Sequence, residues 1–574
     1  MFIKTTKANG YEYIKLVESY RANGKANHRV LYNFGRADLI RQDESFLRIA
    51  KRLCEIANIP VAQRVECEKP TGVTYEDCSE ATFYNYGYMA YRKLWRDLGI
   101  EGCLEEVASK TKVTYSIPDA VFLMAVQHLL QPRSKLSTHI GQQRYYDMDE
   151  THLQHMYRAL DKLAEQKSQI EKSLFQYNYI RTNKKVDVVF YDVTTFSFES
   201  VEADELRNFG FSKNCKFNEV QVVLGMIIDA DGIPVGYELF PGNTFDGKTM
   251  VKALENIKER FGINRVIIVA DRGINSKGNL KLIKEAGYGY IMASKIKGMS
   301  GAMQEKILAP EGFVTLDDTK SESGFRYKVI SHENVFTDEN GKKHSLEENL
   351  IVSYSPKRAK KDAKDRARLV EKAEKLLSEP EKINAANKRG GKKYLNGTKK
   401  SQTWTLATEK IEKDALFDGY YGIQSSEKTL SAAEVMEAYS MLWKIEESFR
   451  IMKSTLEVQP IFHWNENRIK GHFVVCFLAF LMERNMELLL KCDTGESNPA
   501  ASPLKIRDAL NSMQLAAVTT SEREIFIKAK PEPLGKQIFA KLGMTIPANI
   551  STKDDLNVTF QNIKGQYPLQ MSLR

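Results

Sequence analysis

Three acidic residues, Asp192, Asp271 and Glu446, have the residue type that two-metal phosphodiester chemistry requires. Such chemistry needs carboxylates that hold two hard cations about 4 Å apart, one activating water and one stabilising the leaving oxygen. The three acids are far apart in the chain, so the elements that carry them must meet in the fold. Each acid should therefore lie at the edge of a buried element.

Asp192 and Asp271 each end an apolar run that is typical of a buried strand, VDVVFYD and VIIVAD. Polar or turn-forming residues follow both acids, and ligands gather at such strand ends. An Asp in this position can also be only a helix cap or a turn former. For either residue taken alone, that second interpretation stays open.

The segment from Ser431 predicts one long helix that begins with a capping box. Its apolar stripe recurs at a spacing of three to four residues and consists of Val435, Ala438, Leu442, Ile445, Phe449, Met452 and Leu456. At about 100° per residue, Glu446 borders this stripe and Glu447 points to solvent. Glu446 is therefore the predicted third acid.

Basic and aromatic residues accompany Glu446 on the predicted helix. Tyr439 and Lys453 fall in line with it, and Arg450 follows one turn later. An acid beside two cations suits a metal next to a phosphate. A simple surface pair between Glu446 and Arg450 explains the arginine adequately, but it does not explain the in-line Tyr439 and Lys453.

The rest of the chain indicates a mixed α/β protein. Residues 1–36 predict a three-stranded meander with turns at Asn9-Gly10 and Asn23-Gly24, and residues 43–57 and about 86–175 predict helices. From 186 the pattern predicts three strands, a helix near 246–260, the strand before Asp271, a helix and a further strand. Residues 297–425 predict a β-rich insertion with a basic helical arm, which could equally be a solvated helix or contact DNA.

Charge and cysteine content restrict the partners. The net charge of +10 favours a polyanion, although an ordinary basic protein would also show it. Seven scattered cysteines without a C-x-x-C pair, no apolar leader and a longest apolar run of only 473–482 predict a cytoplasmic, nucleoid-associated protein without membrane contact. We also predict no structural zinc, because no zinc-ligand spacing occurs, and no ATP-driven step.

Further residues could contact DNA. Lys213 and Arg272 lie near the acids in sequence and could bind phosphates, or they could simply be solvated. Trp404 lies on a strand-like piece of the insertion, where it could stack on a displaced base, although a buried core tryptophan is the commoner case.

Around these residues the sequence resembles the DDE transposases of bacterial insertion sequences, specifically the group with the helix signature Y-x2-R-x3-E-x6-K. Tyr439, Glu446 and Lys453 fall in register with the signature, and Leu442 stands at the arginine position, for which Lys444 or Arg450 could substitute. Upstream, YDVTTFSFES, GFSKN, PGNTFD and VADRG are similar to the group's other blocks. The resemblance covers about 186–490.

The resemblance implies an RNase H-like catalytic core interrupted by a β-rich insertion. It also implies two Mg²⁺ or Mn²⁺ ions at Asp192, Asp271 and Glu446, cut-and-paste transposition, and a homodimer on paired transposon ends with target DNA. Tyr439 and Lys453 would hold the DNA end. We expect a meander at 1–40, a helical end-binding region at 41–180, the core at 181–300 and 426–492, the insertion at 301–425, and dimerisation or DNA binding at 493–574.

Two other functions remain open from the sequence. An RNase H-like endonuclease, such as a resolvase, would need the same acids but would cut without joining strands. A domesticated relative would bind DNA without catalysis, although the presence of all three acids argues against it.

Overall fold

The structure of the protein is a computed structural model. It describes residues 2–8, 10–22, 25–40, 46, 48, 52, 81–184, 186, 188–210, 219–244, 249–250, 253, 261, 266–315, 324–337, 341–383, 390–397, 404–491, 501–519 and 523–564. Lys213 and most of the helices expected over 43–57 and 246–260 lie outside these residues. The chain forms two compact units, Met1–Ser79 and Glu80–Arg574.

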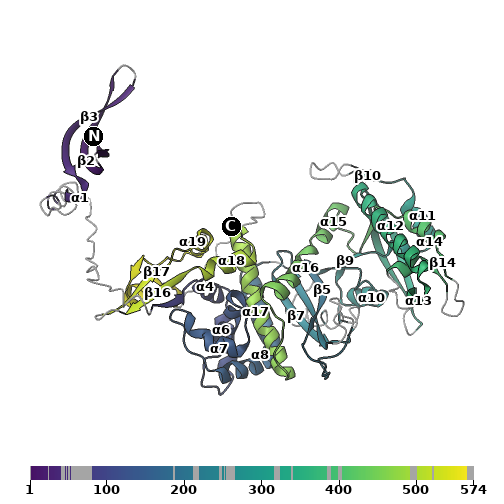
Figure 1. Ribbon diagram of the computed structural model, residues 1–574. Coiled ribbons are helices and arrows are strands. Elements are labelled where there is room, and N and C mark those ends of the chain that lie inside the picture. Colours follow the sequence, from purple (N-terminus) through teal and green to yellow (C-terminus); the bar gives the residue numbers. More distant parts are fainter. Residues whose placement is uncertain are drawn as a thin grey trace. The chain divides into compact units, whose positions relative to one another are not determined.

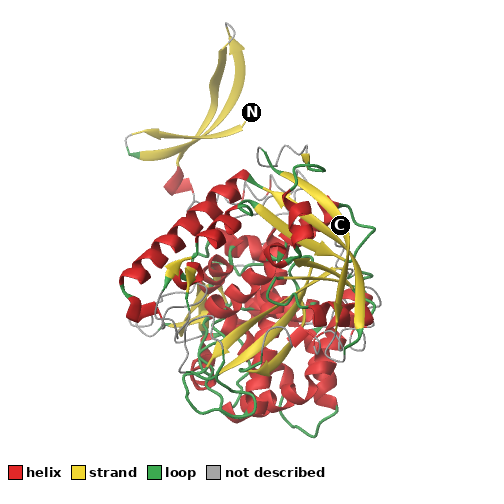
Figure 2. Ribbon diagram, turned by 90° about the vertical axis from the view of Figure 1, so that its right-hand side faces the viewer, coloured by secondary structure: helices red, strands yellow, loops and turns green. Residues whose placement is uncertain are grey.

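The N-terminal unit is a three-stranded antiparallel sheet, which confirms the predicted meander (Figure 2). Its strands are β1 (Phe2–Ala8), β2 (Tyr11–Ala22) and β3 (Lys25–Arg36), followed by the short helix α1 (Ala37–Ile40). Gly10 has a φ of +81° in the turn between β1 and β2, a backbone conformation that glycine adopts without steric cost. The Asn-Gly signal therefore located this turn correctly.

The second unit begins with β4 (Thr82–Asn85) and then a helical bundle, as predicted for about 86–175. Its helices are α4 (Met89–Asp97), α5 (Ile100–Ser109), α6 (Ile117–Leu130), α7 (Lys135–Gly141) and α8 (Leu153–Phe175). The Ser116 hydroxyl caps α6 by accepting a hydrogen bond from the Asp119 backbone N–H. Almost every residue of α6 is buried, so this helix forms the centre of the bundle.

Helix α17 (Glu466–Lys491), which comes much later in the chain, joins this bundle to the sheet. It packs against α6 and α8 on one side and against β7 (Pro234–Pro241) on another (Figure 1). A Cβ at Gly471 would lie 2.1 Å from the Leu160 carbonyl oxygen, so only glycine fits at the crossing with α8. In none of the described ranges does a helix have the length and apolarity needed to cross a membrane.

The sheet beside α17 starts as an antiparallel meander and continues with parallel strands. β5 (Val188–Ser197), β6 (Gln221–Asp229) and β7 are antiparallel, whereas β8 (Ile267–Ala270) and β9 (Gly289–Ala293) run parallel to β5, with α10 (Lys277–Glu285) between them. Nearly all residues of these strands are buried, because helices cover the sheet. The predicted mixed α/β class is confirmed.

The region between β9 and the signature helices extends the same sheet. The strands β10 (Val314–Thr315), β11 (Arg326–Thr337), β12 (Lys343–Tyr354) and β15 (Tyr420–Ser425) give the nine-stranded order β10-β11-β12-β15-β9-β8-β5-β6-β7. The basic arm is the helix α12 (Pro356–Ser378). It packs with smaller elements, namely α13 (Pro380–Ile383), β13 (Leu395–Asn396), β14 (Thr405–Leu406) and α14 (Thr408–Ala415), while α11 (Gly301–Leu308) follows β9.

The C-terminal region closes on the start of the second unit. β16 (Gln514–Thr519) pairs with β4 in a four-stranded sheet of order β18-β17-β16-β4, where β17 spans Glu524–Lys528 and β18 spans Ile550–Ser551. The helices of this region are α18 (Pro503–Asn511), α19 (Pro533–Lys541), α20 (Lys553–Thr559) and α21 (Gln561–Lys564). The helices after β4 and the C-terminal elements thus share one hydrophobic core, although they are far apart in the sequence.

Candidate active site

Asp192 lies inside β5 and not at its end, so the predicted strand end is wrong. Pairing with β6 continues through Ser197, which faces Gln221, while the parallel pairing with β8 stops at Tyr191 and Ala270. The residues after Asp192 are Val193, two threonines and Phe196, whose shapes suit a strand. Asp192 is nevertheless the first residue of β5 beyond its pairing with β8.

Asp271 directly follows β8, as predicted, and is exposed. Because Tyr191 is paired with Ala270, the next residues of the two strands, Asp192 and Asp271, are neighbours across strands that lie about 4.8 Å apart. Side chains alternate along a strand, so Asp192 shares the face of Phe190, which belongs to the core under the signature helices. The sheet thus brings the first two acids together.

The segment expected as one long helix is broken. α15 (Ala432–Ser440) ends before Met441, α16 (Trp443–Arg450) follows, and residues 451–455 form a π-helical turn. The predicted capping box at Ser431 and Glu434 is present. Because of the break and the π turn, a constant 100° per residue does not apply from Tyr439 to Lys453.

Glu446 and Glu447 have different surroundings from those predicted. Glu447 does not point freely to solvent: its carboxylate lies 3.3 Å from Arg484 Nη1 and 3.4 Å from Arg450 Nη2. The simple pair considered for Arg450 therefore exists with Glu447 in place of Glu446. Among the described residues, the exposed side chain of Glu446 takes part in no hydrogen bond or ion pair, and the same holds for Asp271.

Helix α16 packs against β5 on the face of Asp192. Ile445 and Phe449 of α16 belong to the same hydrophobic core as Phe190 and Phe196 of β5. The preceding helix α15 packs on β8, β9 and β15. The two helices that carry the signature residues therefore cover the strands that carry the aspartates.

Tyr439 lies near Asp271. Its hydroxyl is 2.7 Å from the hydroxyl of Tyr421, a residue of β15. Burial, the bond to Tyr421 and the negative charge of Asp271 together raise the pKa of Tyr439 above its usual range. Sequence patterns did not single out Tyr421, because its contact is made across the fold.

The other signature positions are only partly near the acids. Lys453 Nζ lies 5.4 Å from the centre of the Phe196 ring, at the far end of β5. Leu442, at the signature arginine position, is buried in the core. Lys444 donates to the Ala230 carbonyl in the β6–β7 turn, so of the two candidate substitutes Arg450 has the more exposed cation, with 72% of its side chain accessible.

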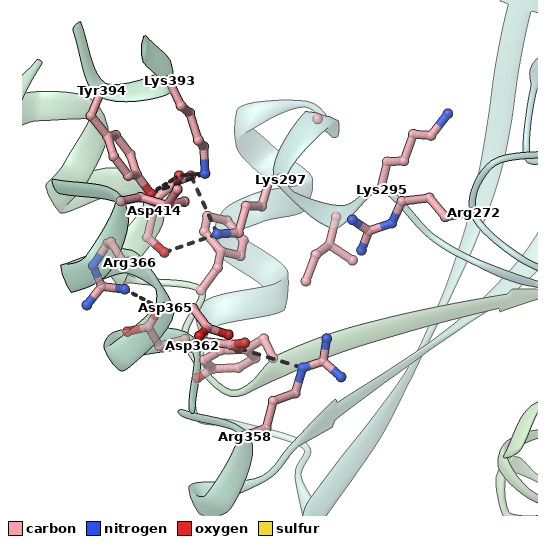
Figure 3. A pocket seen from close by; sticks show the side chains of 16 residues that line it. Arg272, Lys295, Lys297, Arg358, Asp362, Asp365, Arg366, Lys393, Tyr394 and Asp414 are labelled. Carbon is pink, nitrogen blue, oxygen red and sulfur yellow. Dashed lines mark hydrogen bonds and ion pairs between the residues drawn. The ribbon is translucent and has the colours of Figure 1, made fainter. Parts of the chain in front are cut away.

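A pocket of about 310 Å³ begins at Arg272, the residue after Asp271, and extends along α12 (Figure 3). On one side its cations are paired with acids. Lys297 and Lys393 both contact Asp414, and Arg366 forms an ion pair with Asp418. The cations on this side of the pocket are therefore neutralised by acids of the protein itself.

Three cations lie apart from that cluster, namely Arg272, Lys295 and Arg358 (Figure 3). Arg272 forms no ion pair among the described residues. Lys295 donates to the Asn275 carbonyl at 3.0 Å. Arg358 stacks on Tyr421 at 4.4 Å and forms an ion pair with Asp362 at 3.6 Å, one turn along α12 (Figure 3). Arg358 belongs to the basic arm, where the charge pattern alone could not distinguish it from its neighbours.

Trp404 lies away from these cations, next to β14. It is partly buried against a small cluster that includes Tyr394 and Leu395, and Lys392 Nζ lies 5.1 Å from its ring centre. This packing accords with the core interpretation of the residue. Lys213 lies outside the described residues.

The donor set fits hard divalent cations. Mg²⁺ and Mn²⁺ prefer carboxylate oxygen, and Asp192 and Asp271 each directly follow the last pair in the register of β5 and β8. The carboxylates of Asp271 and Glu446 have no protein partner among the described residues and could accept such ions.

Comparison with known proteins identifies the family. A model described as the IS1634 family transposase, N-terminal domain, matches residues 3–63. A model described as the transposase DDE domain matches residues 184–482, more than half of the 574 residues. No curated protein matches the chain.

One similar solved structure is titled "Mos1 transposase paired-end complex with left transposon end". The sequences are 12% identical, the TM-score is 0.14, and the match covers 32% of this chain and 60% of that one. The chain thus spans less than two thirds of that structure's length. On the family matches, the protein belongs to the DDE transposases of insertion sequences.

Proposed function

We propose that this transposase cleaves the ends of its element by two-metal hydrolysis and joins the freed 3′-hydroxyls to target DNA. Asp192, Asp271 and Glu446 would hold the metals. The observation that supports the proposal is the register of β5 and β8: Asp192 and Asp271 directly follow its last pair, Tyr191 with Ala270, and α16 packs against β5. The order β7-β6-β5-β8-β9 supports an RNase H-like core at 181–300 and 426–492.

Two Mg²⁺ or Mn²⁺ ions would activate the attacking water and stabilise the leaving oxygen when bound. The protein's own contribution is to hold three carboxylates in place by rigid elements. α16 is fixed on β5 through Ile445 and Phe449, so Glu446 cannot swing away with a loose segment. The ion pair of Glu447 with Arg484 ties the same helix to α17.

The cations beside the acids would hold the DNA backbone. Arg272, Lys295 and Arg358 form a group that phosphate oxygens could reach, and Arg forks match phosphate well. Tyr439, Lys453 and Arg450 would hold the DNA end on the helix side. The insertion at 301–425 would then contribute to DNA binding through α12, with Trp404 serving the packing of the insertion.

End recognition is proposed for the N-terminal meander at 1–40 and the helices at 41–180. The region 493–574 would serve dimerisation or DNA binding in a homodimer on paired ends. Removing residues 1–79 deletes one compact unit and leaves the other whole. The shortened protein should lose its preference for the terminal inverted repeats while retaining salt-sensitive binding to any DNA.

Incubation of purified protein with pre-cut ends, supercoiled target DNA and Mg²⁺ tests the function. We expect integrated product from the native protein, and a loss of at least a hundredfold in Asp192→Asn and Asp271→Asn, each of which should still bind end DNA. Cutting without integration would identify an endonuclease. Metal-dependent nicking that survived Asp192→Asn would refute the assigned site.

A further inference from the structure

A second cluster of metal-ligating side chains lies in the core of the helical bundle. His128 of α6 and His472 and Cys476 of α17 are all buried, and one potential ligand atom from each lies within 4.8 Å of the others. His472 and Cys476 are four residues apart on one helix, so they share a face. The cluster consists of nitrogen and sulfur donors, unlike the carboxylate site.

Backbone carbonyls orient both imidazole rings. His128 Nδ1 lies 2.9 Å from the Leu456 oxygen, and His472 Nε2 lies 3.0 Å from the Val458 oxygen. A ring N–H donated to each carbonyl leaves the lone pair on His128 Nε2 and on His472 Nδ1. Metal-binding histidines are commonly oriented by such a bond to a carbonyl.

The ring of His472 carries an unsatisfied nitrogen. His472 Nδ1 is buried and has no hydrogen-bond partner among the described residues. Buried polar atoms without a partner are uncommon and call for a ligand or another explanation. Cys476 Sγ lies 3.6 Å from Nε2 of the same ring, so a thiol is already next to this imidazole.

We propose that His128, His472 and Cys476 form a structural site for Zn²⁺ or a similar borderline metal ion. Two imidazoles and one thiolate are a ligand set typical of zinc. His463, whose ring centre lies 5.5 Å from that of His472, or a water would complete four-coordination. The expectation of no structural zinc rested on ligands close in sequence, whereas here one ligand comes from a different helix.

Lys135 is the competitor for this site. Its Nζ lies 3.2 Å from His128 Nε2, and the side chain is buried. A metal ion can use this nitrogen only when the amine moves away from it. Replacing Lys135 by an uncharged residue of similar length should therefore strengthen metal binding.

The site would stabilise the segment that follows the signature helices. Leu456 and Val458, whose carbonyls orient the two histidines, come directly after the π-helical turn at 451–455. A metal ion that fixed both rings would hold this segment against α6 and α17. The metal ion would stabilise the position of α16, the helix that carries Glu446, without taking part in catalysis.

Titration of the full-length protein with Co²⁺ tests the proposal, because a thiolate ligand produces a charge-transfer band that a carboxylate site does not. We expect one equivalent of Co²⁺ with this band, displaceable by Zn²⁺. Cys476→Ser should abolish the band. Cys103→Ser, which alters another buried free cysteine, should retain it, and so should Asp192→Asn.

Lys135→Met separates loss of the site from misfolding, because the proposal predicts tighter Co²⁺ binding in this variant, and a misfolded protein would not bind more tightly. We expect the affinity for Co²⁺, read from the charge-transfer band, to rise at least tenfold in this variant, with one equivalent still saturating the band. The proposal is overturned if neither the native protein nor Lys135→Met shows the band. It is equally overturned if the band persists in Cys476→Ser.

Discussion

The hydroxyl groups of Tyr421 and Tyr439 lie 2.7 Å apart and connect the strand β15 to the signature helix α15. Arg358 of α12 stacks on Tyr421. Burial raises the pKa of Tyr439 most, the hydrogen bond to Tyr421 raises it further, and the negative charge of Asp271 adds a smaller increase. The region between β9 and α15 therefore contacts the immediate surroundings of a proposed catalytic acid. A change in this region can act on the proposed site through this pair of tyrosines.

Tyr421→Phe should lower the free energy of unfolding by about 1 kcal/mol, because Tyr439 loses its partner in a partly buried place. In a double-mutant cycle with Tyr439→Phe, urea unfolding should give a coupling energy of about 0.5–1.5 kcal/mol. Tyr420→Phe is the matched control, since its hydroxyl makes no hydrogen bond among the described residues. Additive losses in the cycle would show that the two hydroxyls do not interact.

Glu446→Gln and Glu447→Gln should separate catalysis from stability. Glu446 is exposed and has no partner among the described residues, so its replacement should leave the free energy of unfolding unchanged and abolish end cleavage. Glu447 pairs with the buried Arg484, which keeps Glu487 as a closer partner at 2.6 Å, so its replacement should cost about 0.5–1.5 kcal/mol while cleavage persists. The reverse pattern, measured by urea unfolding and end cleavage, would make Glu447 the third acid.

Asp271 could be placed from the sequence because the apolar run stops at that residue, and the strand β8 stops there too. The position of Asp192 inside its strand could not be predicted, because the polar residues after it resemble a turn. They are in fact a strand: Thr194 and Thr195 are β-branched and pair with Leu224 and Val223. Such a polar stretch can be recognised as a strand only when the strand it pairs with is known.

Around Glu446, the features that the sequence did not predict depend on contacts between residues far apart in the chain. The helical period correctly favoured an apolar face, but the break after Ser440 and the π turn interrupt it. Glu447 seemed solvent-exposed because Arg484, its partner, comes from another helix. A residue's neighbours on its own helix do not show such a partner.

Glu483→Gln should reduce the pH dependence of stability. Burial and then the charge of Glu487 raise the pKa of Glu483 to about 8, so the folded protein keeps a proton that the unfolded chain loses near pH 4.3. The free energy of unfolding should thus fall as pH rises from about 5 to 8, by at most about 1.4 kcal/mol per pH unit from this group. Glutamine does not titrate but can still accept the hydrogen bond from Tyr91.

Denaturant unfolding of both proteins across this pH range measures the difference. The native protein should lose more stability than Glu483→Gln between pH 5 and pH 8. Glu105→Gln, on the exposed side of α5, should follow the native curve. Parallel curves for the native protein and Glu483→Gln would mean that Glu483 is ionised in the fold.

Gly471→Ala should destabilise the second unit by at least about 1–3 kcal/mol, the range for overpacking in a core. The added methyl group would meet the Leu160 carbonyl, so α8 and α17 would have to separate. Gly278→Ala in α10 is the control, because its Cβ would meet nothing within 4 Å. A thermal transition that dropped equally in both variants would refute the close crossing.

Arg358→Ala should weaken DNA binding without preference for sequence, because the proposed contact is with phosphate. The slope of the logarithm of the binding constant against the logarithm of salt concentration should become smaller by about one. Arg368→Ala on the same helix provides the control: its side chain is 65% accessible and does not line the pocket.

The two variants remove the same charge from α12, so any general effect of net charge on the DNA appears equally in both. Only a phosphate bound in the pocket beside Arg272 changes the salt slope for Arg358→Ala and leaves it unchanged for Arg368→Ala. Equal slopes in both variants, with Arg358→Ala still folded by urea unfolding, would exclude this pocket from the DNA path. The basic arm would then act through its overall charge alone.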